Sequence, residues 1–381
     1  GLGDVYKRQA QIKTISTYRA SDGNYPITFV GSANLTGAYS DFINAGLATD
    51  HTNYTTVKSE TSAVPISLST FATASAAMIT DLNKLLKEAE GLVTVAIEDD
   101  VSSYSLLTSA DYRLNTANDN SKTHSVTVNT GSQALGSAAV GNLNNLAGQS
   151  PITSITGTIT AFTATAVDAL SADLDSDNST MSFTMAGSGS DGTLTVSQAT
   201  GLLDHTSATT TGVNVIYTGG ISGALSDFTV AANPSSVITA VQAVITEDSD
   251  APLTVTNNKL TTKTEIAQLN ALATASAGVI TATVEATGEN LLSIGSGGIT
   301  IGTADTDAIT ITVTDAISAS HWATLDGKTS STVTLSGGFS GALSGFADDS
   351  DITSNLSSAF GVAANKSQKI TVTGTLGSAN I

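Results

Sequence analysis

The sequence predicts an α/β repeat protein, an elongated solenoid of strand–short helix–strand units with a Thr-rich sheet face exposed to solvent. Three observations lead to this prediction. Segments of the chain match one another at regular offsets, predicted strands alternate with short helices, and the strands are apolar on one face only. The alternative that the pattern leaves open is a row of tandem β-sandwich domains with short helices.

Internal repeats are the first observation. Residues 79–98 match residues 266–285 at an offset of 187, and residues 35–42 (LTGAYSDF) match residues 221–228 (ISGALSDF) at an offset of 186. A third copy of the shorter segment, FSGALSGF, occupies residues 339–346. Self-similarity at regular offsets is the signature of stacked repeat architectures.

A shorter period lies beneath these long offsets. A Leu-Asn or Leu-Asp pair within a helical pattern recurs along the chain, beginning at Leu82, Leu143, Leu203, Leu269 and Leu325. This recurrence predicts a partial first repeat and five further repeats, with boundaries at 10–60, 61–125, 126–190, 191–255, 256–315 and 316–381. Residues 1–9 (GLGDVYKRQ) match no repeat and lack an initiator Met. We therefore expect a non-native or assembly-derived leader there and exclude it from the fold prediction.

The second observation is that every repeat predicts the same order of elements: strand, short helix, strand, second short helix. Representative strands are expected at 193–197, 212–217, 279–284 and 309–314, and representative helices at 262–275 and 221–228. Hydroxyl side chains stand where helix N-caps are expected, at Thr262, Ser318 and Ser235. Strands that alternate with helices indicate crossover connections between parallel strands.

The third observation is the one-sided apolar pattern of the strands. In residues 309–314 (ITITVT), Ile and Val alternate strictly with Thr. A doubly wound parallel sheet is covered on both faces and reads as a continuous apolar run. Here one face is predicted to be buried and the other to carry rows of Thr, as at residues 310, 312, 314, 371 and 373. Helices on one face of a parallel sheet are typical of an α/β solenoid.

The composition excludes several classes of function. The chain has 14 basic and 33 acidic residues, and no Lys or Arg lies between Lys122 and Lys259. Nucleic acids and anionic membrane surfaces require clustered basic residues, so neither is an expected partner. The sequence contains no Cys, which excludes a disulfide framework, a Cys-ligated zinc ion and a thiol nucleophile. It also contains no apolar run of membrane-spanning length, so we expect no membrane insertion.

Three helix–turn–strand segments carry a resemblance to a known class of repeats. They are LNALATASAGVITATV (269–284), LLDHTSATTTGVNVIY (202–217) and LNKLLKEAEGLVTVAI (82–97). They resemble the Ala/Thr-rich repeats of very large secreted or cell-surface proteins of marine bacteria, cyanobacteria especially, and of related phage fibre proteins. The resemblance covers roughly residues 60–380 in degenerate form. It implies an extracellular, cell-surface or virion location, a structural role without catalysis, and a dependence on calcium.

One acidic segment predicts a calcium site. Asp173, Asp175, Asp177 and Asn178 belong to the string Asp-Leu-Asp-Ser-Asp-Asn, in which carboxylates at every second position resemble the start of an EF-hand loop. The match ends there, because Asn178 stands where the loop has Gly and Thr184 stands where it has Glu. The alternative interpretation is a solvated acidic turn before a strand at 181–185. Smaller acidic clusters recur at 98–100, 247–250, 305–307 and 348–351.

Other motifs predict no chemistry. The G-x-G-x-x-G string of Gly187, Gly189 and Gly192 precedes an expected strand, so we interpret it as a turn and not as a dinucleotide site. The four histidines, at 51, 124, 205 and 321, have no metal-ligand spacing. Trp322, the only Trp, is expected to fill the core of a repeat. We therefore expect no catalytic residue, no cofactor other than calcium, and no enzyme.

These observations favour a structural or adhesive repeat segment, a stalk or spacer, of a large extracellular or surface-layer-type protein. Two alternatives stay open: a phage tail fibre or other virion structural protein, and a glycan-binding module that uses the Thr-rich face. The expected partners are neighbouring repeats or like chains, and a polysaccharide or cell surface.

Overall fold

The structure of the chain is a computed structural model. It describes residues 35–37, 42–44, 49–50, 65–68, 85, 93–98, 124–129, 140–141, 143–144, 147, 152–170, 179–187, 192–206, 215–292, 307–348 and 351–374. The chain divides into two compact units, a first unit of residues 1–192 and 201–216 and a second unit of residues 193–200 and 217–381. Both contain open parallel sheets and short helices, which confirms the predicted mixed α/β class.

The first unit contains a seven-stranded sheet whose neighbouring strands are all parallel. Its order is β1 (Leu35–Gly37), β4 (Ile66–Leu68), β5 (Val93–Glu98), β6 (His124–Asn129), β7 (Ile152–Phe162), β8 (Ser179–Met185) and β10 (Val215–Ile216). A short antiparallel pair, β2 (Ile43–Asn44) and β3 (Thr49–Asp50), and helix α6 (Ala164–Val167) complete its named elements. Phe162 and Phe183 are fully buried, with their ring centroids 5.1 Å apart.

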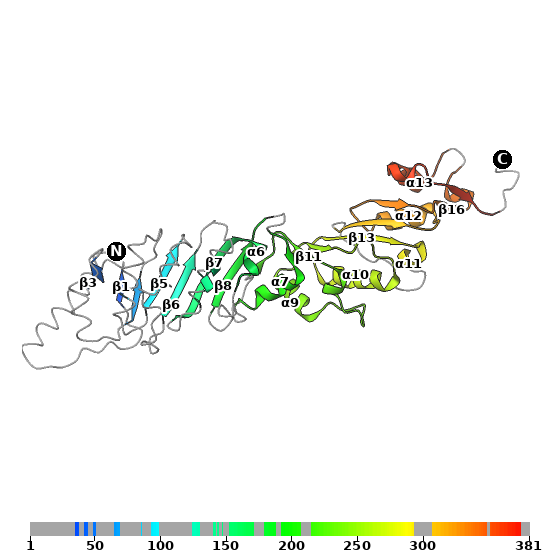
Figure 1. Cartoon of the computed structure of the whole chain (residues 1–381). Helices are drawn as coiled ribbons and strands as arrows, with labels where there is room; N and C mark the ends of the chain where they lie inside the picture. Colours follow the sequence, from blue (N-terminus) through cyan, green and yellow to red (C-terminus); the bar gives the residue numbers. More distant parts are fainter. Residues whose placement is uncertain are drawn as a thin grey trace, which may run out of the picture. The chain divides into compact units, whose positions relative to one another are not determined.

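The second unit contains a six-stranded parallel sheet and a separate parallel pair (Figure 1). The sheet consists of β9 (Leu194–Thr195), β11 (Ile221–Gly223), β12 (Leu253–Val255), β13 (Ile280–Ala286), β14 (Ala308–Val313) and β15 (Val333–Leu335). The pair consists of β16 (Phe339–Gly341) and β17 (Ile370–Val372). Strand order follows chain order in each of these parallel sheets, so each strand pairs with the next strand of its sheet through a crossover connection.

Short helices occupy the crossover connections. They are α7 (Val196–Leu203), α8 (Leu225–Phe228), α9 (Thr239–Glu247), α10 (Lys263–Ala275), α11 (Gly288–Leu292), α12 (Ala319–Asp326) and α13 (Ser354–Gly361), with 3-10 turns η4 (Leu343–Gly345) and η5 (Ala363–Asn365). One strand–helix step leads from Ile221 to its register partner Leu253, and the next step leads from Leu253 to Ile280. The shorter period of the sequence therefore spans two strand–helix steps.

Strands β12, β13 and β14 are buried on one face, as the alternating pattern predicts. In β14 the residues Ile309, Ile311 and Val313 are fully buried while the Thr residues between them keep part of their surface exposed. Helix α10 lies along one side of the sheet (Figure 1) and contributes the buried residues Ile266, Leu269 and Leu272 to the core. The core of the second unit is thus the layer between helices and sheet.

Two glycines with positive φ precede strands in equivalent places. Gly220 and Gly338 have φ angles of +77° and +83°, a region that residues with a Cβ rarely adopt. The N–H of the next residue then donates to a carbonyl just before the neighbouring strand, at 2.8 Å in both cases: Ile221 to Pro252, and Phe339 to Lys369. Leu35 makes the same bond to Pro65 at 2.9 Å. The three segments matched by sequence thus begin with equivalent strands; the predicted repeat boundaries stay a prediction.

Two expectations about helices are confirmed. Thr262 is the N-cap of α10, where its side chain accepts from the N–H of Glu265 and the Glu265 carboxylate accepts in return from the N–H of Thr262. Ser318 caps α12 by accepting from the N–H of His321. Trp322 is buried on α12, and its indole N–H donates to the carbonyl of Val333 at 3.0 Å.

Three expected elements are wrong in detail. Residues 221–228 are not one helix, because the first three are bonded into the sheet as β11 and only 225–228 form α8. The strand expected at 193–197 ends at Thr195, because Thr195 and Gln198 bond reciprocally and start α7 at Val196. Ser235 is no N-cap: its hydroxyl donates to Asn233 and α9 begins at Thr239.

The glycine turn gives a first prediction. Gly338→Ala should lower the free energy of unfolding by about 1–3 kcal/mol, because Ala resists a positive φ and its Cβ overlaps the carbonyl of Lys369. Urea unfolding followed by circular dichroism measures the change. Gly361→Ala, at the end of α13, is the control, since a Cβ there meets nothing within 4 Å. Equal midpoints for the two variants contradict the argument.

Candidate functional site

Hydroxyl residues lie in register across the sheets, and we call these series the hydroxyl rows. In the second unit the row runs over four consecutive strands through Thr195, Ser222, Thr254 and Thr281. In the first unit a row of register partners runs over five neighbouring strands through Thr36, Ser67, Thr94, Ser125 and Ser154. Ser340 pairs with Thr371 in the two-stranded sheet. Every described sheet of parallel strands therefore has such a row.

Ser222, Thr254 and Thr281 of the second unit's hydroxyl row lie on the sheet face away from the helices, whereas the Thr195 hydroxyl bonds Gln198 at the start of α7. Successive residues of a strand point to opposite faces, and Leu253 and Val255, on either side of Thr254, are buried in the core. Thr195 and Thr281 are exposed, and Thr254 is half-buried. Strand spacing places neighbouring hydroxyl groups about 4.8 Å apart. Ser222, Thr254 and Thr281 therefore offer regularly spaced donors and acceptors to a polar ligand.

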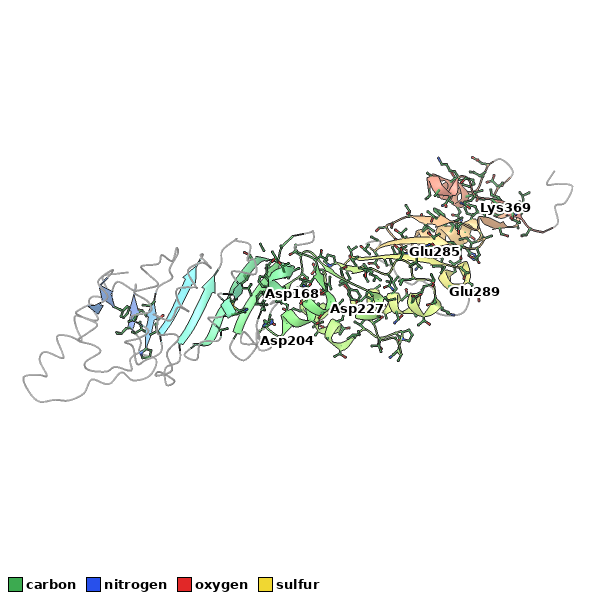
Figure 2. The ribbon with its side chains drawn as sticks, in the orientation of Figure 1. Asp168, Asp204, Asp227, Glu285, Glu289 and Lys369 are labelled. Atoms are coloured by element: carbon green, nitrogen blue, oxygen red, sulfur yellow. The ribbon has the colours of Figure 1, made fainter. Side chains whose placement is uncertain are left out.

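Other hydroxyl groups on this face bond across strands. The Oγ1 atoms of Thr312 and Thr334 lie 3.1 Å apart, and Thr310 makes an equal contact with the hydroxyl of Ser331. Glu285 of β13, labelled in Figure 2, forms an ion pair with Lys259. These contacts stabilise the face and bring together no nucleophile and base. Among the described residues of this face, we find hydrogen-bonding groups and no constellation for acid–base chemistry.

Buried polar side chains form a second group, which we call the acceptor residues. Each accepts the backbone N–H of a residue 20 to 31 positions earlier: Asp248 from Tyr217, Asp307 from Ile280, Thr329 from Ile309, and Asn365 from Leu335. The donor–acceptor distances lie between 2.7 and 3.0 Å. Asn365 is completely buried and also donates to the carbonyls of Val333 and Ala359. Their role is to satisfy backbone groups that the sheet leaves without a strand partner.

Asp248 is the acceptor residue with unusual electrostatics. Burial raises the pKa of its carboxyl above the ordinary value of 3.8; the hydrogen bond from Tyr217 opposes this rise, and the nearby acidic groups Asp250 and Glu247 add to it. Burial likewise raises the pKa of the Tyr217 phenol, which donates to the carbonyl of Ala199 at 2.9 Å. Folding therefore favours the protonated form of Asp248.

The candidate calcium ligands lie outside the described residues. This applies to all four of them, Asp173, Asp175, Asp177 and Asn178. Four described members of the smaller acidic clusters accept backbone N–H groups: Asp248, Asp307, Asp348 and Asp351. In the part of the chain that the structure describes, no group of three or more His, Asp or Glu side chains is arranged to hold a metal ion. The calcium site stays a prediction.

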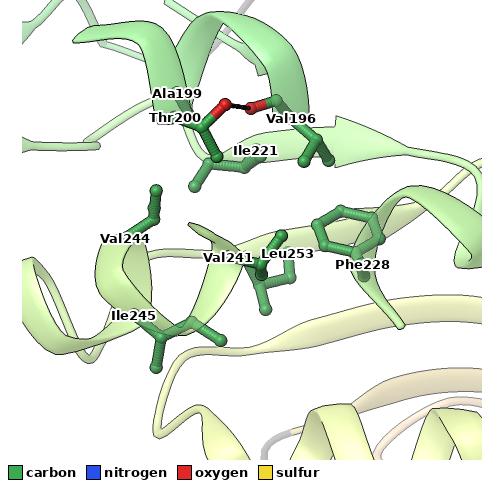
Figure 3. A pocket seen from close by; sticks show the side chains of 9 residues that line it. All are labelled: Val196, Ala199, Thr200, Ile221, Phe228, Val241, Val244, Ile245 and Leu253. Carbon is green, nitrogen blue, oxygen red and sulfur yellow. Dashed lines mark hydrogen bonds between the residues drawn. The ribbon is translucent and has the colours of Figure 1, made fainter. Parts of the chain in front are cut away.

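The core of the second unit contains a small apolar cavity (Figure 3). It lies between the sheet residues Ile221 and Leu253 and the helical residues Phe228, Val241 and Val244, with a volume of about 10 Å³. A cavity of this size barely holds one water molecule, and apolar walls give a water no partners. It is a packing defect and not a ligand site.

A wider groove lies on the surface of the same unit. Its volume is about 610 Å³, and it runs between residues 235–237 and the side of α10 that carries Ala267, Ala271 and Ala275. Gln242, Asn270 and Thr274 supply amide and hydroxyl groups to its walls. The residues that line it include no titratable side chain, so the groove favours packing or weak polar binding over catalysis.

No family model, no curated protein and no solved structure matches the chain. Within the described ranges, none of the helices has the length and apolar character needed to cross a bilayer. His321 is exposed on α12 and His205 follows α7.

A second prediction concerns Asp248. Its folded pKa lies above the ordinary value, so the stability that it contributes is complete below about pH 3.8 and is lost as the pH rises through the folded pKa. Asp248→Asn keeps the acceptor for Tyr217 without a buried charge, as Asn365 does in the equivalent place. We expect a higher melting temperature at pH 7 and little difference from wild type in acid.

The matched control is Asn365→Asp, which introduces the charge where Asn now stands. It should lower the melting temperature at pH 7 more than in acid. Differential scanning calorimetry of both variants between pH 4 and 8 measures these differences. A lower melting temperature for Asp248→Asn throughout the range contradicts the assignment.

Proposed function

We propose that the chain is a structural or adhesive repeat segment, a stalk or spacer, of an extracellular or surface-layer-type protein, and that it is not an enzyme. The observation that carries the proposal is the recurrence of one module. A glycine turn, a three-residue strand, and a bond from the strand's first N–H to the carbonyl before the next strand occur at Ile221 and again at Phe339. Recurrence of a module that contacts its neighbours in sequence is typical of repeat proteins.

We propose further that these modules stack as a solenoid. Support comes from the strand order, in which each parallel strand pairs with the next strand of its sheet along the chain. The acceptor residues add support, because each one completes the backbone bonds of the preceding strand–helix step. A chain built in this way lengthens by one strand spacing for each step, which suits a spacer.

The surface chemistry also supports a spacer outside the cytoplasm. The net charge is −19 and only 12% of residues are charged, so the surface is solvated mainly by hydroxyl and amide groups. Tail fibres and other virion structural proteins need the same surface properties. A phage tail fibre or other virion structural protein is therefore the alternative function for the same architecture. In either setting the partners are neighbouring repeats or like chains.

Small-angle X-ray scattering of the full chain tests the proposal. We expect the profile of an elongated particle in calcium-containing buffer. If the predicted ligands Asp173, Asp175, Asp177 and Asn178 bind calcium and stabilise the array, excess chelator should shorten or loosen the particle. A compact globular profile in both buffers would rule out the solenoid and with it the stalk. An elongated profile that does not change when chelator is added would support the stalk proposal and contradict the predicted calcium site.

A second candidate function, contact with a polysaccharide, is favoured by the hydroxyl rows. In the second unit, Ser222, Thr254 and Thr281 present regularly spaced hydroxyl groups on the face that also carries the Glu285–Lys259 ion pair. Thr254→Val with Thr281→Val should abolish retention on polysaccharide-coated surfaces while leaving the fold intact, since Val matches Thr in shape and favours strands. Thr324→Val on α12 is the control. Equal retention of both variants would exclude the row as the contact.

A further inference from the structure

Strand β17 has an open, apolar edge. Among the described residues it pairs only with β16, and its two apolar residues, Ile370 and Val372, are 39% and 41% exposed. Ile352, in the segment that leads into α13, is 44% exposed. These are three of the five large apolar residues that are exposed in the described chain. Exposed apolar residues on an edge strand indicate a contact surface.

The equivalent positions in another part of the second unit are less exposed: two are buried and the third is half-buried. Strand β12 corresponds to β17, because Ile221 pairs with Leu253 as Phe339 pairs with Ile370. The N–H groups of Thr256 and Thr373, just after these strands, also donate equally to the carbonyls of Gly223 and Gly341, at 2.8 Å in both cases. Val237 corresponds to Ile352, since each closes an antiparallel bridge after α8 or η4.

In the covered copy the partner is one helix–strand segment. Strand β13 pairs with the edge of β12 that faces away from β11, and there the N–H of Leu253 donates to the carbonyl of Val279 at 2.9 Å. Leu253 and Val255 of β12 are only 1% and 5% exposed. Val237 lines the groove against α10, whose residues lead into β13. In the first unit β5 covers β4 in the same register, from Ile66 to Val93.

We propose that the edge of β17, together with Ile352, is a docking site for a further helix–strand repeat of the type that residues 257–292 form on β12. The strand of that repeat adds to β17 in parallel, and its preceding helix packs on Ile352. Its required chemistry is an alternating apolar and hydroxyl strand after a helix with an apolar stripe like that of Ile266, Leu269 and Leu272. The inference deepens the proposed function and rests on it, because such additions lengthen a repeat array.

The test is a chain in which a copy of residues 257–292 follows Thr373, compared with the full chain by residue-resolved hydrogen exchange. In β12 the N–H of Leu253 points to the added strand, whereas the N–H of Thr256 points to β11. We therefore expect exchange at Ile370 and Val372 to slow by about tenfold or more in the extended chain. Exchange at Thr373, which already bonds Gly341, should change little.

The control carries the same extension with Asn at the three positions that copy Ile266, Leu269 and Leu272. It should leave Ile370 and Val372 unprotected, because the helix then has no apolar face. Slow exchange at these amides in the unmodified full chain would overturn the proposal, since the edge is then already covered. Protection that grows with protein concentration would overturn it in favour of a second copy of the chain. An elongated scattering profile without protection in the extended chain would overturn this inference and leave the stalk proposal standing.

Discussion

The second unit depends on backbone N–H groups finding acceptors in the next strand–helix step. Its short strands bury amides at their ends that a neighbouring strand does not reach, and a buried amide without a partner costs about 1–3 kcal/mol. The acceptor residues supply the missing partner from a position 20 to 31 places later in the chain. Each step is therefore completed by its successor, and stability is shared between neighbouring steps, a distribution that is typical of repeat proteins.

This dependence has an electrostatic consequence. An acceptor must be buried to reach the strand, and a buried carboxylate resists ionisation, as the raised pKa of Asp248 indicates. Asn365 performs the same task as a neutral amide and bonds two further carbonyls. An acidic and a neutral acceptor in equivalent places give steps of unequal sensitivity to pH within one unit. The open edge of β17 follows from the same dependence, because among the described residues no later strand–helix step supplies acceptors for its outer N–H groups.

Sequence patterns predicted local structure well where one element satisfied its own requirements. Residues 309–314 alternate because a strand covered on one face must do so, and α10 begins at Thr262 because its capping box is contained within one short segment. The prediction of one helix at 221–228 failed because Ile221 to Gly223 are bonded by β9 and β12, two strands that are distant in the sequence. The start of α7 had a local signal, Thr195 followed by Gln198, which the β-branched residues around it obscured.

The sequence by itself determined the mixed α/β class, the one-sided burial of the strands, the recurrence of the module at 35–42, 221–228 and 339–346, and the acidic, hydroxylated surface. These properties follow from periodicity and composition, which every segment carries within itself. The register that aligns Thr195, Ser222, Thr254 and Thr281 was decided only by the tertiary structure. So were the pairing of Asp248 with Tyr217 and the exposure of Ile370 and Val372. Each of these depends on which residues meet across long gaps in the sequence, and that choice is made by the packing of whole strand–helix steps and not by any single segment.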